Sequence, residues 1–131
     1  MKKSFAFLSF LLFISISIYA QQGQVIKTDS IVFEKTVHDY GTITQGADGN
    51  CEFTFTNKGQ KPLVLSNVRA SCGCTVPTWP KKPIAPGKTG VIKVKYNTAR
   101  MGSFNKSITV SSNAANSRVT LKITGNVIKK K

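Results

Sequence analysis

The sequence predicts an all-β fold, a β-sandwich of about seven antiparallel strands that follows an N-terminal signal peptide. Two observations carry this prediction. Between residues 31 and 128, apolar and polar side chains alternate in short runs, which is the period of a strand with one buried face. Turn signals separate these runs at intervals of about 8 to 12 residues, and no helical period follows Gln22. Together they favour two packed sheets.

The N-terminal segment, residues 1–20, is typical of a secretory signal peptide. Lys2 and Lys3 precede an apolar run that ends at Ile18, and Ala20 is a small residue at the expected cleavage position. An uncleaved anchor helix needs about 20 apolar residues, which is longer than this run. We therefore expect cleavage after Ala20, no membrane span after signal cleavage, and a periplasmic or secreted protein.

The remaining residues, 21–131, have the length of a single domain, with its core expected at 31–128. Without Lys2 and Lys3, the chain has 17 Lys and Arg against 5 Asp and Glu. Such a basic surface attracts polyanions. Export and the even spread of the lysines argue against nucleic acid. The expected partner is a protein or an anionic cell-envelope polymer.

The alternation also assigns faces to the strands. In each predicted strand the apolar residues should point into the core while the intervening Lys, Arg, Thr and Ser face water. Gly125 interrupts the last strand and predicts a bulge or a bend. The expected strand regions are 31–41, 51–56, 63–68, 91–96, 103–111 and 118–128, and the expected inward residues of the last three are Ile92, Val94, Tyr96, Phe104, Ile108, Val110, Val119, Leu121 and Ile123.

One segment, residues 71–87, differs from the rest because it holds two of the three cysteines, the only tryptophan and four of the five prolines. Cys72 and Cys74 are separated only by Gly73, which can bring its neighbours' side chains together because it has no Cβ. Following prolines oppose ordinary ladder pairing, so the pair should lie at an end or edge of the sandwich. The segment is the candidate binding site.

The two cysteines leave several interpretations open. They could form a labile, redox-active disulfide, or hold copper as Cu(I), for which closely spaced thiolates are suitable ligands. Alternatively they pack, or one pairs with Cys51, which alternates with Phe53 and is expected to be a buried structural thiol. A zinc site that adds His38 has enough ligands but matches no ordinary zinc spacing.

Other chemistry-bearing residues give weaker signals. His38 and Asp39 are adjacent on a predicted strand, so their side chains point to opposite faces and form no catalytic relay with Ser71. No catalytic residue is therefore expected, and the chain is not predicted to be an enzyme. Trp79, between two prolines, is either an exposed recognition aromatic or a lid over one end of the sandwich.

Four motifs in order suggest a family. The segments 38–43, 53–59, 71–75 and 83–87, which read HDYGTI, FTFTNKG, SCGCT and PIAPG, resemble the bacterial family called domain of unknown function 1573. The resemblance implies a secreted or periplasmic immunoglobulin-like sandwich, related to the major sperm protein and Hydin domains, and it brings no assigned reaction. Tyr40 stands where the family more often has Phe. The leading hypothesis is a non-enzymatic binding or structural module of the cell envelope; the alternatives are copper handling and thiol redox chemistry.

Overall fold

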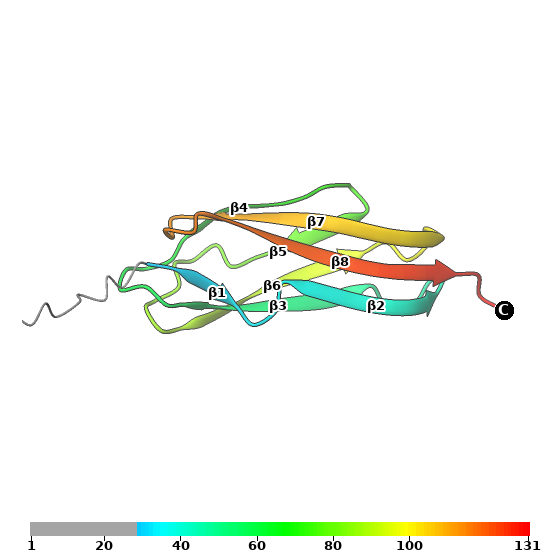
Figure 1. The fold of residues 1–131 in the computed structure, drawn as a ribbon, viewed down its shortest axis with the longest axis horizontal. Coiled ribbons are helices and arrows are strands. Elements are labelled where there is room, and N and C mark those ends of the chain that lie inside the picture. The colour runs from blue at the N-terminus through cyan, green and yellow to red at the C-terminus, as the bar shows by residue number, and fades with distance from the viewer. Residues whose placement is uncertain (1–28) are drawn as a thin grey trace, which may run out of the picture.

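The structure is a computed structural model that describes residues 29–131. The predicted signal peptide, residues 1–20, and its cleavage bond lie outside the described residues. Within them the chain forms two four-stranded sheets stacked as an elongated sandwich (Figure 1). The described part contains strands and turns only, and it has no helix long and apolar enough to cross a membrane. The predicted all-β sandwich is confirmed.

The first sheet has the strand order β1-β3-β6-β5, and all its neighbours are antiparallel. Its two central strands show the expected alternation, with every second side chain buried. Its strands are β1 (Ile31–Phe33), β3 (Asn50–Asn57), β6 (Thr89–Tyr96) and β5 (Thr75–Thr78).

Strand β5 was not predicted, because Pro77 lies within it. Pro77 has no N–H to give to a ladder, which limits proline to edge strands. β5 is such an edge, since it pairs with β6 on one side only. The first part of the proline-rich segment therefore belongs to the first sheet. The sandwich has eight strands where about seven were predicted.

The second sheet has the order β2-β8-β7-β4, and one of its pairs departs from the predicted antiparallel pattern. β2 runs parallel to β8. β1 and β2 are separated only by residues 34–36 and lie in different sheets, so the chain crosses from one sheet to the other here instead of forming a hairpin. The strands are β2 (Val37–Thr44), β8 (Arg118–Ile128), β7 (Gly102–Ser112) and β4 (Leu65–Ala70).

The core lies between the sheets and includes the predicted inward residues of the last three strands. Val119 is partly buried and the others are buried, which confirms the predicted faces of the last three strands. The predicted start of the third strand at Leu63 is wrong by two residues. Leu63 makes only an isolated bridge to Ile84, and the regular ladder begins at Leu65.

Gly125 lies opposite a register shift in the β2–β8 pair, between Asp39 and Thr42, in agreement with the predicted bulge or bend, and it also makes room for an aromatic ring. The β7–β8 register runs through the pair Phe104 and Gly125 without a shift. A Cβ at Gly125 would lie 2.7 Å from Cζ of Phe104, so the glycine leaves room for the ring. Phe104 in turn stacks on Tyr96 with 3.8 Å between ring centroids. The glycine serves close packing at one end of the core.

Candidate functional site

The cysteine segment forms a tight turn between β4 and β5. Cys72 and Cys74 are joined by a disulfide, with their Cα atoms 5.3 Å apart. The turn is closed by the amide of Thr75, which donates to the carbonyl oxygen of Cys72 at 3.2 Å. Because β4 and β5 are edge strands of different sheets, the bridge lies where the chain passes from one sheet to the other.

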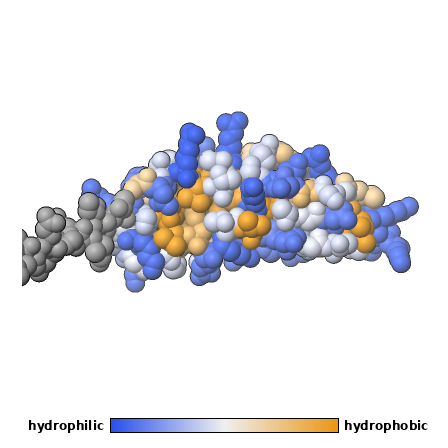
Figure 2. Space-filling model, viewed as in Figure 1, coloured by the Kyte–Doolittle hydropathy of each residue, from blue (hydrophilic) through white to orange (hydrophobic). Residues whose placement is uncertain are grey.

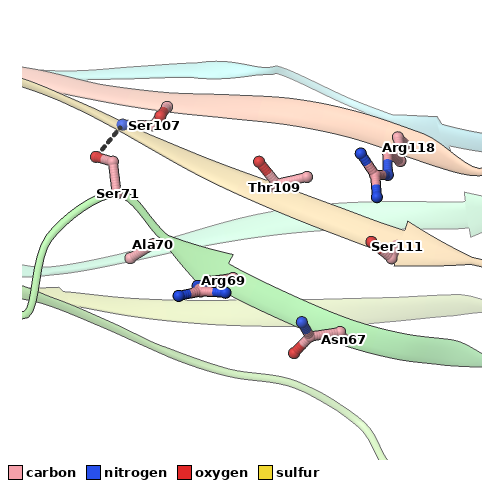
Figure 3. Close-up of a pocket in the computed structure, with 8 residues that line it drawn as sticks. All are labelled: Asn67, Arg69, Ala70, Ser71, Ser107, Thr109, Ser111 and Arg118. Carbon is pink, nitrogen blue, oxygen red and sulfur yellow. Dashed lines mark hydrogen bonds between the residues drawn. The ribbon is translucent and has the colours of Figure 1, made fainter.

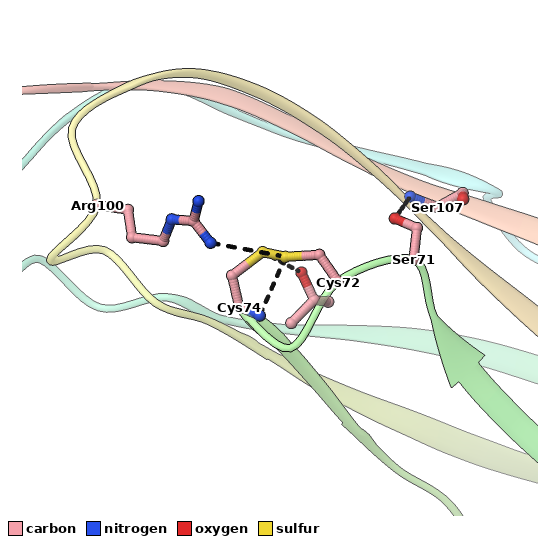
Figure 4. The surroundings of a disulfide bond; sticks show 6 residues. Ser71, Cys72, Cys74, Arg100 and Ser107 are labelled. Atoms are coloured by element: carbon pink, nitrogen blue, oxygen red, sulfur yellow. Dashed lines mark hydrogen bonds between the residues drawn. A yellow bond between two sulfur atoms is a disulfide. The ribbon is translucent and has the colours of Figure 1, made fainter.

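The two sulfur atoms of the bridge have different surroundings (Figure 4). Sγ of Cys72 is partly exposed and accepts the backbone N–H of Cys74 at 3.0 Å. The guanidinium of Arg100 reaches the same sulfur, with Nη1 at 3.9 Å. Cys74 is only 6% exposed, and its sulfur lies 3.7 Å from the hydroxyl of Thr75. Polar donors therefore converge on Cys72 rather than on Cys74.

Arg100 comes from the turn after β6, far along the sequence from the cysteines. The turn is fastened to the cysteine segment, since the amide of Asn97 donates to the carbonyl oxygen of Cys74 at 2.8 Å. The amide of Arg100 then donates to the carbonyl oxygen of Asn97 at 3.2 Å. These two bonds hold the backbone of this turn beside the bridge, from where the Arg100 side chain reaches Cys72. Sequence reasoning missed Arg100, because no local pattern links it to Cys72.

Cys51 is a free thiol in the core, 7% exposed, as the alternation on β3 predicted. It therefore does not pair with Cys72, one of the alternatives left open by the sequence. Burial raises the pKa of the Cys51 thiol above its usual range. Burial raises the pKa of Tyr40 as well, and the side-chain interaction with Cys51 is the second cause. The Tyr40 hydroxyl donates to the carbonyl oxygen of Gly49 at 2.7 Å. Both shifts favour the neutral form of these groups.

His38 lies on β2, away from the bridge. Its Nδ1 is 3.0 Å from Nζ of Lys35, and its ring meets Tyr40 edge to face. Partial burial, and then the Lys35 ammonium, lower the pKa of His38, while Asp39 opposes them. Among residues 29–131 no three His, Cys, Asp or Glu side chains cluster to hold a metal, so the four zinc candidates are not brought together.

Copper remains a prediction for the reduced pair alone. While the Cys72–Cys74 bridge is intact, neither sulfur is a thiolate, and thiolate is the form that binds Cu(I).

Trp79 follows β5 and is half-buried against the core. Nζ of Lys81 lies 3.1 Å from the centroid of its ring, an arrangement that favours a cation over the aromatic face. One face of the indole is thus covered by the protein's own lysine. The ring has less free surface than an exposed recognition aromatic would have.

A second candidate site, which the sequence analysis did not single out, is a shallow groove on the outer face of the second sheet. Figure 3 shows Thr109 on β7 between Arg69 on β4 and Arg118 on β8. At one end, Ser71 Oγ accepts the backbone N–H of Ser107 at 3.2 Å. The lining residues are all polar except one alanine: Asn67, Arg69, Ala70, Ser71, Ser107, Thr109, Ser111 and Arg118.

The groove contains cations and hydroxyls but no acid. A signal for it was present in the sequence, because all five Asp and Glu lie between Asp29 and Glu52 and none follows. Only Asp39 of the five lies on a strand of the second sheet. Its carboxylate accepts the amide of Gly41 at 2.8 Å. The sequence did not predict the strand pairing that places Arg69 and Arg118 on either side of β7.

The face drawn in Figure 2 is covered mainly by hydrophilic side chains, with small hydrophobic areas between them. The exposed large apolar side chains come from several elements: Val32, Val37, Val64, Val76, Met101 and Ile128. The most exposed are Val76 and Met101, at 57% and 56%.

Comparisons with known proteins identify a family and a fold. The family described as "Protein of unknown function (DUF1573)" matches residues 31–127. A search of curated protein sequences gives no match. A protein of unknown function from Porphyromonas gingivalis W83 is similar in structure, with a TM-score of 0.68 and 18% identity, over 76% of this chain and 47% of that one. The chain thus spans less than half of that protein.

Two further structures have the same fold. PapD-like domain 7 of human CEP192 has a TM-score of 0.61 and 9% identity, over 80% of this chain and 89% of that one. The YadV chaperone has a TM-score of 0.55 and 17% identity, over 74% of this chain and 51% of that one. At these identities the likeness establishes an immunoglobulin-like, PapD-like sandwich and nothing about ligands.

Proposed function

Since the chain belongs to the DUF1573 family, whose description assigns no activity, we propose from its own surface that it is a non-enzymatic binding module of the cell envelope. Its ligand is an anionic polymer, and its binding site is the groove between Arg69 and Arg118. The observation that carries this proposal is a groove lined by two arginines and four serine or threonine hydroxyls, with no acid among its lining residues.

The register of the second sheet supports an extended ligand. Across β4, β7 and β8, Asn67, Ser111 and Arg118 form one row of side chains; Arg69, Thr109 and Thr120 form the next. A third row pairs Ser107 with Lys122. Each row therefore carries one cation, and successive rows are separated by about 7 Å along the strands. A chain of carboxylates or phosphates lying along the strands would meet a cation at each step.

The chemistry of the lining favours a polymer over a protein surface. Protein interfaces draw most of their affinity from buried aromatic or aliphatic anchors, and the groove offers no pocket for one. It offers guanidinium groups, which bind carboxylate and phosphate with two parallel hydrogen bonds. Serine and threonine hydroxyls both donate and accept, as a polyol ligand requires. An acidic polysaccharide of the envelope has anionic groups for the guanidinium groups to bind and hydroxyls that can hydrogen-bond to the serine and threonine side chains.

A protein partner is the second candidate, favoured by a different observation. β4 has β7 on one side only, so its other edge carries unpaired backbone groups that an added strand could bind. The similarity to a chaperone fold is compatible with such a partner. The edge of β4 adjoins the groove, so the two candidates are separated by which residues a ligand needs.

The experiment compares polymer binding by the mature protein and two double variants. Arg69→Gln with Arg118→Gln should weaken binding to alginate, a carboxylated polysaccharide, about tenfold or more, because two charge-assisted contacts are lost. Lys93→Gln with Lys95→Gln removes the same charge from the outer face of β6, on the other sheet, and should change binding much less. Neutral dextran should not bind.

Equal losses in the two double variants would show that net charge alone attracts the polymer. Binding of alginate and dextran alike, or no binding of any acidic polysaccharide, would also contradict the proposal. Because all four substituted side chains are exposed, each variant should keep its stability within about 0.5 kcal/mol of the parent.

A further inference from the structure

The Cys72–Cys74 bridge adds little to the stability of the sandwich. In the chain-entropy account, a disulfide stabilises a protein by restricting the unfolded chain, and the effect grows with the length of the closed loop. This bridge spans one intervening residue. Cys74 is buried in the core and Cys72 packs against it, so these side chains contribute to stability by packing rather than by closing a loop. The position of the bridge calls for another explanation.

The polar contacts of the bridge distinguish its two sulfurs. On reduction, the backbone N–H of Cys74 at 3.0 Å and the guanidinium of Arg100 at 3.9 Å both favour a negative charge on Cys72. A cation and an aimed amide are what make a cysteine reactive.

Access to the two sulfurs follows the same order. Cys72 is partly exposed, and Gly73 beside it is exposed with open space where a Cβ would stand. Cys74 is buried, 6% exposed, and contacts only the Thr75 hydroxyl among polar side chains. A thiol from another protein can therefore approach Cys72, whereas Cys74 stays behind it.

We propose that Cys72 and Cys74 form a thiol–disulfide exchange site that oxidises dithiols of exported proteins, with Cys72 as the attacked sulfur, Cys74 as the buried partner, and Arg100 as the group that stabilises the Cys72 thiolate. This is a second function, independent of the polymer groove. The structure contains the oxidised form, from which such a reaction starts.

The exchange balances in two steps. First, a thiolate of the partner dithiol attacks Sγ of Cys72; the Cys72–Cys74 bond breaks, and its electron pair goes to Cys74, which takes up a proton. The partner's second thiol then loses its proton and attacks its own sulfur in the mixed disulfide. Cys72 leaves as a thiolate facing Arg100 and the Cys74 amide. Two electrons have passed from the partner dithiol to the bridge, and a stabilised thiolate leaves faster.

The first test needs no variant. The mature protein is reduced, freed of reductant, and treated with limiting iodoacetamide, and the labelled peptides are quantified by mass spectrometry. Cys72 should be labelled at least about tenfold faster than Cys74 near neutral pH, with buried Cys51 slowest. Equal labelling of Cys72 and Cys74, or faster labelling of Cys74, overturns the proposal.

The second test concerns Arg100 and exchange itself. Arg100→Gln should move the pH midpoint of Cys72 labelling upward by about one unit, a tenfold loss of thiolate below it. Arg118→Gln removes an arginine far along the second sheet and should leave that midpoint in place. Oxidised glutathione should form a mixed disulfide with Cys72 in Cys74→Ser, and much more slowly with Cys74 in Cys72→Ser. An unchanged labelling midpoint in Arg100→Gln would show that Arg100 does not stabilise the Cys72 thiolate. Faster glutathione capture by Cys74 than by Cys72 would contradict the roles assigned to the two sulfurs.

Discussion

Single side chains fasten the loops of this sandwich, and Asn57 is the clearest case. Asn57 ends β3 and is 2% exposed. Its amide nitrogen donates to the carbonyl oxygens of Lys61 and Ile84, at 2.8 and 2.9 Å, and its oxygen accepts the amide of Gly59 at 2.9 Å. One buried side chain thus satisfies three backbone groups of two loops, which explains why a polar residue stands where the alternation places a core position.

Asn57→Ala should lower the free energy of unfolding by about 3 kcal/mol, because three buried or half-buried backbone groups lose their partner. Urea denaturation of the variant and the parent measures the difference. Asn105→Ala, at an exposed position on β7, is the matched control and should stay within about 0.5 kcal/mol. A cost for Asn57→Ala no larger than that of the control would mean that water replaces the side chain.

At the residue scale, the sequence predicted which side chains are buried better than it predicted which side chains contact each other. Cys51 was assigned to the core correctly, because its alternation with Phe53 is a local property of β3. The position of Arg100 beside Cys72 was not predicted. It depends on the turn after β6 being bonded to the segment after β4, and 28 residues separate the two side chains in the chain.

At the scale of strands, period-two alternation located the central strands and failed at the margins. β3, β6, β7 and β8 were all predicted, since each buries one face and must alternate. β5 was missed because an edge strand can contain a proline, which counts against a strand in any local rule. The parallel pairing of β2 with β8 was also missed, because it depends on where the chain changes sheets rather than on composition.

Leu121→Ala should cost about 2 to 5 kcal/mol of unfolding free energy, because Leu121 is 0% exposed in the middle of β8 and its removal leaves a cavity. Thermal or urea unfolding provides the measurement. Thr120→Ala, at the adjacent outward position, should have a small effect. If Leu121→Ala falls within about 0.5 kcal/mol of the parent, the inward face of β8 is assigned wrongly.

At the scale of the whole molecule, stability and reactivity reside in different places. The core is held between the two sheets, while the disulfide lies in the turn between β4 and β5 and the cationic groove lies on an outer face. The fold itself was readable from the sequence. The groove could not be predicted from the sequence, because its two arginines lie on β4 and β8, and only the pairing of both strands with β7 places them on one face.

Replacing both Cys72 and Cys74 with serine should cost less than about 2 kcal/mol of unfolding free energy, because a one-residue loop constrains the unfolded chain very little and only Cys74 of the two is buried. Denaturation of the double variant against the oxidised parent measures this. A loss above about 2 kcal/mol, the typical contribution of a structural disulfide, would instead assign the bridge a role in holding the sandwich together.

The central claim is that the outer face of the second sheet binds an anionic polymer, and mapping of amide chemical shifts by NMR tests it most directly. The mature protein, labelled with ¹⁵N, is titrated with short alginate oligomers. If the groove is the binding site, the amide chemical shifts should change most at Arg69, Thr109, Ser111 and Arg118 and change little on β3 and β6. Shifts concentrated on the outer face of β6 around Lys93, or spread evenly over the lysines, would contradict it.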